Sequence, residues 1–86
     1  MRELNQKARD LSLYRLQKAK EDLESSKKNY QGGDLRTAVN RAYYAIFHSL
    51  RAVLALDEYD SKKHSGVICE FRLRYVKTEV TIQNST

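Results

Sequence analysis

The segment GGD, residues 32–34, interrupts an otherwise helix-favouring sequence and decides the fold. Two successive glycines can end a helix in a left-handed cap, and the Asp34 side chain can accept amide hydrogen bonds at the start of the next helix. The sequence on either side is rich in Leu, Ala, Lys, Glu and Arg, and the chain contains no proline. The segment therefore predicts two helices that meet in a tight hairpin.

The helix before this segment is expected to run from about Ser12, or earlier, to Tyr30. Apolar and small residues recur on it at spacings of three and four, and the predicted packing face consists of Leu16, Ala19, Leu23, Ser26 and Tyr30. Leu4, Ala8 and Leu11 lie off this face, so they belong either to a preceding helical segment packed at a different angle or to a frayed end. The charged residues predict a solvated face formed by Lys18, Lys20, Glu21, Glu24, Lys27 and Lys28.

The helix after the glycines should span Leu35 to about Leu56. At about 100° per residue its large apolar side chains gather in one stripe, with Phe47 on the flank. The members of this stripe are Val39, Tyr43, Ile46, Leu50, Val53 and Leu54. We expect the stripe to face the first helix, which makes Tyr43 a packing residue.

A third helix is expected after a short polar connection at residues 57–61, with Ser61 as its cap and an end near Lys77. One side of it would carry Val67, Ile68, Phe71 and Tyr75, and Cys69 is interpreted as a small buried side chain. The final VTIQNST predicts a frayed tail or a short extended segment. The fold class is therefore all-α, an antiparallel helical hairpin plus a third helix, with one domain at residues 1–78 and a tail or truncated remainder at 79–86.

The charge and the cysteine content limit the possible functions. A net charge of +5 suits a polyanionic partner such as RNA or DNA, because basic side chains release counterions from phosphates, although such a charge also serves solubility alone. The single cysteine excludes an intramolecular disulfide, and neither a metal motif nor a glycine-rich phosphate loop is present, so we expect no cofactor. No apolar run reaches the length of a membrane span. We expect a cytoplasmic protein without a membrane partner.

The stretch RAYYAIFHSL, residues 41–50, places Arg41 and His48 two helical turns apart, so that their side chains can converge on one small ligand group. By helical angle both point away from the predicted packing stripe. The same second face is lined by small residues, which are Ala45, Ala52 and Ala55. We expect this face to pack against a second copy of the chain around a two-fold axis. The plainer interpretation is a histidine with one interface hydrogen bond and an arginine paired with an acidic residue across a dimer.

Further candidate residues surround this pair. Tyr44 and Arg51 fall beside it, and Tyr44 either packs or contacts a phosphate or base. Lys62, Lys63 and His64 precede or begin the third helix, where they could form a phosphate-contacting cluster. The alternative for His64 is a capping or loop hydrogen bond.

Most of the chain, residues 13–78, resembles the HEPN family, the helical domain named for higher eukaryotes and prokaryotes nucleotide-binding. The resemblance rests on AVNRAYYAIFHSLRAVLAL, on the following KKHSGVICEF and on the nearby VKTE. The ribonuclease motif of that family is an arginine, four to six intervening residues and a histidine. Arg41 and His48 match this motif with six intervening residues.

The resemblance implies a dimeric helical bundle whose active members cleave RNA without metal. Such members often act as the toxin of a pair in which a small nucleotidyltransferase is the antitoxin. Arg41 and His48 would then be catalytic, with His48 as general base or acid and Arg41 binding the scissile phosphate. The implied RNA-binding residues are Tyr44, Arg51, Lys62, Lys63 and His64.

Two departures from the family pattern keep a second hypothesis open. Many active members have a polar residue directly after the arginine, whereas Ala42 stands here. The family domain also usually continues for one or two further helices, so we expect the chain to be truncated at its C-terminus. Both departures favour a non-catalytic interaction module, or one that only binds nucleotide or RNA through its dimer face.

Overall fold

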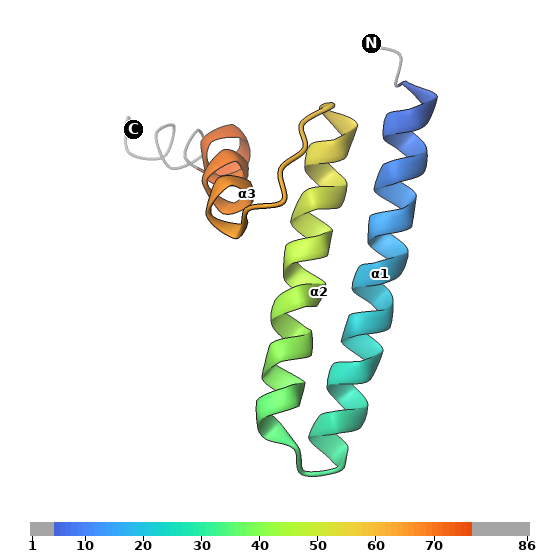
Figure 1. The fold of residues 1–86 in the computed structure, drawn as a ribbon, viewed down its shortest axis with the longest axis vertical. Helices are drawn as coiled ribbons and strands as arrows, with labels where there is room; N and C mark the ends of the chain where they lie inside the picture. The colour runs from blue at the N-terminus through green and yellow to red at the C-terminus, as the bar shows by residue number, and fades with distance from the viewer. Residues whose placement is uncertain (1–4, 77–86) are drawn as a thin grey trace, which may run out of the picture.

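The computed structural model describes residues 5–76, which form helices and no strand. The long helices α1 (Gln6–Gln31) and α2 (Leu35–Leu56) run antiparallel as a hairpin (Figure 1). The short helix α3 (His64–Phe71) and the π-helical turn η1 (Arg72–Val76) follow it. Among the described residues α3 packs against α2 and not against α1. The predicted all-α fold, a hairpin with a third helix, is confirmed.

The turn between the long helices forms as the sequence predicts. Gly33 has φ +86°, a left-handed conformation that glycine adopts without steric cost. The Asp34 side chain caps α2 by accepting a hydrogen bond from the backbone N–H of Thr37 at 3.1 Å. Hydrogen bonding by Thr37 also holds the pKa of Asp34 below its ordinary value. Both the hairpin and the bounds of the second helix are therefore confirmed.

The interface between α1 and α2 is built from small and polar residues rather than from the predicted apolar stripes. Its buried side chains are Ala8, Ser12, Arg15 and Ala19 on α1 and Ala38, Ala45, Ala52 and Ala55 on α2. By contrast Val39 and Ile46 of the predicted stripe are 69% and 62% exposed. The prediction that large apolar side chains of the two helices face each other is wrong, whereas Ala19 and Ser26 of the predicted α1 face do lie against α2.

The physical reason is close approach of the two backbones, which small side chains permit. The Ser12 hydroxyl donates to the backbone carbonyl of Ala52 at 2.8 Å, and the Ser26 hydroxyl donates to that of Ala38 at 2.6 Å. Bulky side chains at these positions would hold the helices too far apart for such bonds. The hairpin therefore presents its larger apolar residues on the flanks. Tyr43 is 40% exposed there and packs against His64 of α3 rather than against α1.

The first helix is continuous through the residues whose role the sequence left open. It begins at Gln6, where Asn5 accepts a hydrogen bond from the backbone N–H of Lys7 at 2.8 Å. Ala8 is buried in the same interface as the rest of α1. Ala8 therefore belongs neither to a separately packed segment nor to a frayed end. Leu4 lies outside the described residues.

A small apolar core joins α3 to α2. Phe47, Leu54 and Val67 are buried together, and Val67 is 0% exposed. The partly buried side chains packed around them are Tyr44, Leu50, Tyr59 and Phe71. This core fixes α3 beside the C-terminal half of α2 (Figure 1).

Two expectations for the third helix are wrong. It begins at His64 rather than at a Ser61 cap, because the Ser61 hydroxyl accepts the backbone N–H of Lys63 in the preceding turn, at 3.2 Å. Cys69 is exposed rather than buried, since α3 turns mainly Val67 into the core. The predicted end near Lys77 and the tail at 79–86 lie outside the described residues.

Candidate functional site

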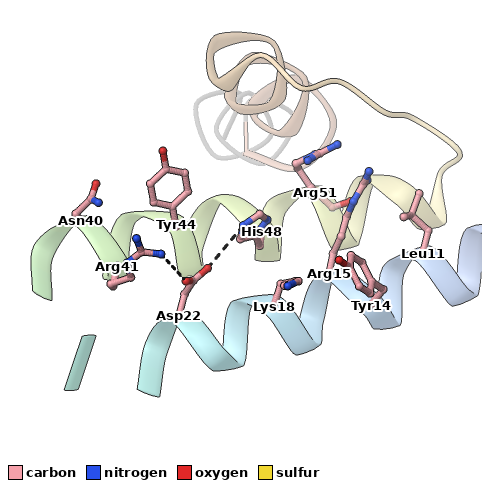
Figure 2. A pocket seen from close by; sticks show the side chains of 10 residues that line it. All are labelled: Leu11, Tyr14, Arg15, Lys18, Asp22, Asn40, Arg41, Tyr44, His48 and Arg51. Carbon is pink, nitrogen blue, oxygen red and sulfur yellow. Dashed lines mark hydrogen bonds and ion pairs between the residues drawn. The ribbon is translucent and has the colours of Figure 1, made fainter. Parts of the chain in front are cut away.

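A cleft of about 550 Å³ lies between α1 and α2 on one side of the hairpin (Figure 2). Of the ten residues that line it, four are arginine or lysine and one is a carboxylate. The lining residues are Leu11, Tyr14, Arg15, Lys18, Asp22, Asn40, Arg41, Tyr44, His48 and Arg51. Because basic groups outnumber the acidic one, the cleft is suited to anions.

Arg41 and His48 meet at Asp22, a carboxylate that α1 places between them (Figure 2). Asp22 Oδ1 lies 3.3 Å from Arg41 Nη1, and Asp22 Oδ2 lies 3.6 Å from His48 Nε2. The side chains of Arg41, His48 and Asp22 are 43%, 25% and 16% exposed. The expectation that the pair points away from the first helix is wrong, because the alanine face that carries it is the face that packs on α1.

The imidazole of His48 is biased towards its neutral form. Partial burial is the main cause that lowers its pKa below the ordinary value of 6.5, while the negative charge of Asp22 acts in the opposite direction. Its Nδ1 is buried and has no hydrogen-bond partner among the described residues. Nε2 is therefore the ring nitrogen through which His48 can exchange a proton with a ligand.

Two of the predicted RNA-binding residues share the cleft with this pair. Tyr44 is partly buried, and the Arg41 guanidinium lies 5.9 Å from its ring centroid. Arg51 is held by Asp60, whose Oδ1 lies 2.7 Å from Arg51 Nη2. That hydrogen bond is the main cause that lowers the pKa of Asp60.

The other three predicted RNA-binding residues lie outside the cleft. Lys62 and Lys63 are exposed in the connection before α3. His64 forms a hydrogen bond with the Tyr43 hydroxyl at 2.6 Å, and its ring packs at a tilt against Phe47 with a centroid distance of 4.0 Å. These contacts tie the start of α3 to α2, so the structure does not bring this cluster to the Arg41–His48 pair.

Apart from Tyr14, three charged cleft residues on α1 were missed from the sequence, namely Arg15, Lys18 and Asp22. Their spacings of three and four place them on one line of the helix, in register with Ser12 and Ala19. Lys18 was assigned to a solvated face, since only the large apolar residues were used to locate the interface. A search for small residues at helical spacing would have found the polar line beside them.

The described residues contain neither a metal-binding cluster nor a membrane-spanning helix. Between residues 5 and 76 no three His, Cys, Asp or Glu side chains gather in a way that could hold a metal ion. Within the same range no helix has the length and apolar character needed to cross a membrane.

These features define a small helical protein with a basic cleft and an Arg–Asp–His constellation. A family model described as HEPN domain matches residues 12–84, which is most of the chain. The protein belongs to the HEPN family, as its sequence predicted.

Several named relatives are similar to this chain. A UPF0332 protein of Pyrococcus horikoshii is 43% identical over 58 residues, covering 67% of this chain and 41% of the relative. The Methanocaldococcus jannaschii protein named "Putative toxin MJ0605" is 47% identical over 58 residues, which cover 67% of this chain and 43% of the relative. A UPF0332 protein of Thermotoga maritima is 36% identical over 75 residues, covering 87% and 56%. The chain thus spans about half the length of these relatives, and no solved structure matches it significantly.

Proposed function

We propose that this protein is a metal-independent ribonuclease of the toxin type that cleaves RNA with Arg41 and His48. The observation that carries the proposal is the meeting of an arginine, a histidine and a carboxylate at one end of a basic cleft. The family assignment and the printed name of the Methanocaldococcus relative support it. In this proposal the protein acts in the cytoplasm, where RNA is available.

In this mechanism the neutral His48 accepts a proton at Nε2 from a ribose 2′-hydroxyl. The resulting oxygen nucleophile attacks the adjacent phosphorus, the bond to the 5′-oxygen breaks, and a 2′,3′-cyclic phosphate forms. Arg41 binds the non-bridging oxygens, on which negative charge accumulates in the transition state. A proton must also reach the departing 5′-oxygen, and solvent water would supply it.

Asp22 acts through the other two residues. Its distance of 3.6 Å from Nε2 is too long for a hydrogen bond, so the nitrogen stays available to the 2′-hydroxyl. Once His48 is protonated, the adjacent carboxylate stabilises the imidazolium. The ion pair with Arg41 also orients the guanidinium before substrate binds.

A homodimer and a nucleotidyltransferase antitoxin complete the proposal. The surface first expected to join two copies is covered, because Ala45, Ala52 and Ala55 pack on α1. An apolar groove on another side of the hairpin, lined by Leu16, Leu23 and Ile46 among others, offers a different dimer surface. The antitoxin is implied by the family resemblance alone.

The alternative function is an RNA-binding or interaction module without catalysis. Its specific support is that Arg41 already has a carboxylate partner within the chain, an arrangement that needs no substrate. Ala42, where many active members have a polar residue, agrees with this alternative.

Cleavage of a labelled RNA in the presence of a chelator distinguishes the two functions. We expect the parent protein to cut and His48→Ala to lose at least about 100-fold in rate, because proton transfer contributes that much. Arg41→Ala should lose about 100-fold as well, through the lost charge stabilisation. Arg36→Ala is the matched control, since Arg36 is exposed on α2 and does not line the cleft. Equal cutting by the parent and His48→Ala would refute the catalytic assignment, and binding without cutting would establish the alternative.

A further inference from the structure

The basic cleft continues well beyond the Arg41–His48 pair. Towards the start of α1 and the end of α2 it is lined by Lys18, Arg15 and Arg51 (Figure 2). Lys18 precedes Asp22 by four residues, which is a rise of about 6 Å along the helix. This is of the same order as the spacing of successive phosphates along an extended RNA strand.

The charges of the cleft are not balanced by the carboxylates around it. Arg41 pairs with Asp22, whereas Arg15 and Arg51 share the single carboxylate of Asp60. Lys18 makes no ion pair with any residue in the described part of the chain. Four basic side chains therefore face two carboxylates, which leaves an excess of two positive charges.

This end of the cleft is fixed in place before any ligand binds. The Arg15 side chain is 8% exposed and lies 2.9 Å from Asp60, and it reaches the backbone carbonyl of Arg51 at 3.5 Å. Arg51 is held by the same carboxylate at 2.7 Å. Because these guanidiniums are already ordered, a bound anion would lose little affinity to side-chain ordering.

Lys18 is the group at this end that remains available to an anion. Its ammonium lies 5.6 Å from the ring centroid of Tyr14, which also lines the cleft. An aromatic face beside an ammonium offers a nucleotide both a stacking surface and a charge. A volume of about 550 Å³ accommodates a nucleotide-sized ligand.

We propose that Lys18, supported by Arg15 and Arg51, forms a second phosphate subsite that binds the phosphodiester next to the one held by Arg41 in single-stranded RNA. The inference rests on the proposed function only in placing the first phosphate at Arg41. It adds that the substrate is a strand with at least two successive phosphodiesters, and that Lys18 contributes to binding rather than to chemistry.

Binding of uncleavable RNA tests this subsite apart from catalysis. A 2′-O-methyl dinucleotide with one phosphodiester is compared with the trinucleotide that has two, by titration against the parent and Lys18→Gln. The parent should bind the trinucleotide about five times more tightly, because one added charge contact contributes about 1 kcal/mol. In Lys18→Gln this advantage should fall to less than about twofold.

A longer strand gives a second, independent readout. For a 2′-O-methyl strand of about 12 nucleotides, log K falls with log salt concentration by about 0.7 for each phosphate contacted. The slope for Lys18→Gln should therefore be shallower than that of the parent by about 0.7. Lys28→Gln is the matched control, because this substitution removes the same charge from an exposed position on α1 that lines neither the cleft nor the apolar groove.

The outcomes separate this inference from the proposed ribonuclease activity. Equal affinity of the parent for the two short oligonucleotides, or an equal effect of Lys18→Gln and Lys28→Gln, would overturn the subsite. The subsite would be established if Lys18→Gln loses the preference for the trinucleotide over the dinucleotide and the control variant keeps it. This holds even if the parent cuts no RNA. If the parent does cut, Lys18→Gln should raise KM and leave kcat within about twofold, since a contact equal in ground and transition states changes only KM.

Discussion

Asp22 connects the two residues on which the proposed chemistry depends. Its carboxylate is 3.3 Å from Arg41 and 3.6 Å from His48, and it comes from the opposite helix. Burial lowers the pKa of His48, and the charge of Asp22 limits that decrease. One residue of α1 therefore adjusts both the position of the arginine and the basicity of the histidine.

The pH dependence of cleavage follows from these opposing causes. A general base must be neutral, so kcat/KM should fall as pH decreases through the pKa of His48, which lies below 6.5. In Asp22→Asn the charge that raises this pKa is gone, and the acid limb should move to lower pH. We also expect kcat to drop about tenfold, less than in His48→Ala, because the imidazolium loses its neighbouring carboxylate. Rates measured between pH 4.5 and 8, together with an NMR titration of His48, provide the check.

Asp10→Asn is the appropriate control for this experiment. Asp10 is exposed on α1 and bonds to Gln6 rather than to a cleft residue. The Asp10→Asn substitution changes the net charge by the same amount as Asp22→Asn does. The pH profile of kcat/KM for Asp10→Asn should nevertheless match that of the parent. An acid limb in Asp22→Asn that stays in place, or moves to higher pH, would rule out the positioning role.

At the scale of the helices, the sequence predicted their existence and ends better than their faces. Asp34 and the two glycines specify the turn through local chemistry that acts within a few residues. The choice of face depends instead on how closely two helices can approach, which is a property of the pair. Alanines and serines at helical spacing decided it here, against the larger side chains of Val39 and Ile46.

The part of the candidate site that lies on α2 was predictable from the sequence, and the part that lies on α1 was not. Arg41, Tyr44, His48 and Arg51 share one helix, so helical periodicity was sufficient to group them. Their partner Asp22 comes from α1, and its position depends on the interface that the sequence did not reveal. His64 was placed correctly along the chain, but its packing on Phe47 is a tertiary contact without a local signal.

The connection between α2 and α3 offers a stability prediction at this scale. Asp60 holds the buried Arg15 and the partly buried Arg51, so Asp60→Ala leaves both guanidiniums without their carboxylate. We expect a loss of about 1 to 2 kcal/mol in the free energy of unfolding, a modest value because Asp60 is itself 53% exposed. Urea denaturation at pH 7 measures it.

The same carboxylate gives that prediction a pH signature. Since the pKa of Asp60 is lowered in the folded protein, its contribution is present above about pH 3.8 and is lost as pH falls through the folded value. The difference between the parent and Asp60→Ala should therefore shrink in acid. Glu58→Ala removes an exposed acidic neighbour in the same connection that pairs with neither arginine, so it should destabilise the protein less at pH 7. Equal destabilisation by the two variants would argue against the Asp60 anchor.

At the scale of the whole molecule, a large apolar surface remains on the hairpin outside the cleft. A groove of about 510 Å³ there includes Leu16, Leu23 and Ile46, and these side chains are 46%, 46% and 62% exposed. Two hairpins that pair through such grooves would form a four-helix arrangement around a two-fold axis. This surface is the one we assign to the proposed homodimer.

Ile46→Glu tests this dimer, because a charge in the groove would be desolvated on association. Sedimentation equilibrium should show a dimer for the parent and a monomer for the variant, a loss of affinity of at least about tenfold. Leu35→Glu is the control, since Leu35 is similarly exposed on α2 but does not line the groove. A monomeric parent, or a dimer that survives Ile46→Glu, would remove this surface from the account.

The central claim concerns chemistry, and the ends of the RNA products test it most directly. RNA cut by the purified protein in chelator is analysed by mass spectrometry, beside RNA that carries a single 2′-deoxy nucleotide at the cleaved position. Attack by the 2′-hydroxyl predicts a 2′,3′-cyclic phosphate and a 5′-hydroxyl, with no cutting at the deoxy position. Products with a 3′-hydroxyl and a 5′-phosphate, or undiminished cutting at the deoxy position, would contradict the proposed roles of Arg41 and His48.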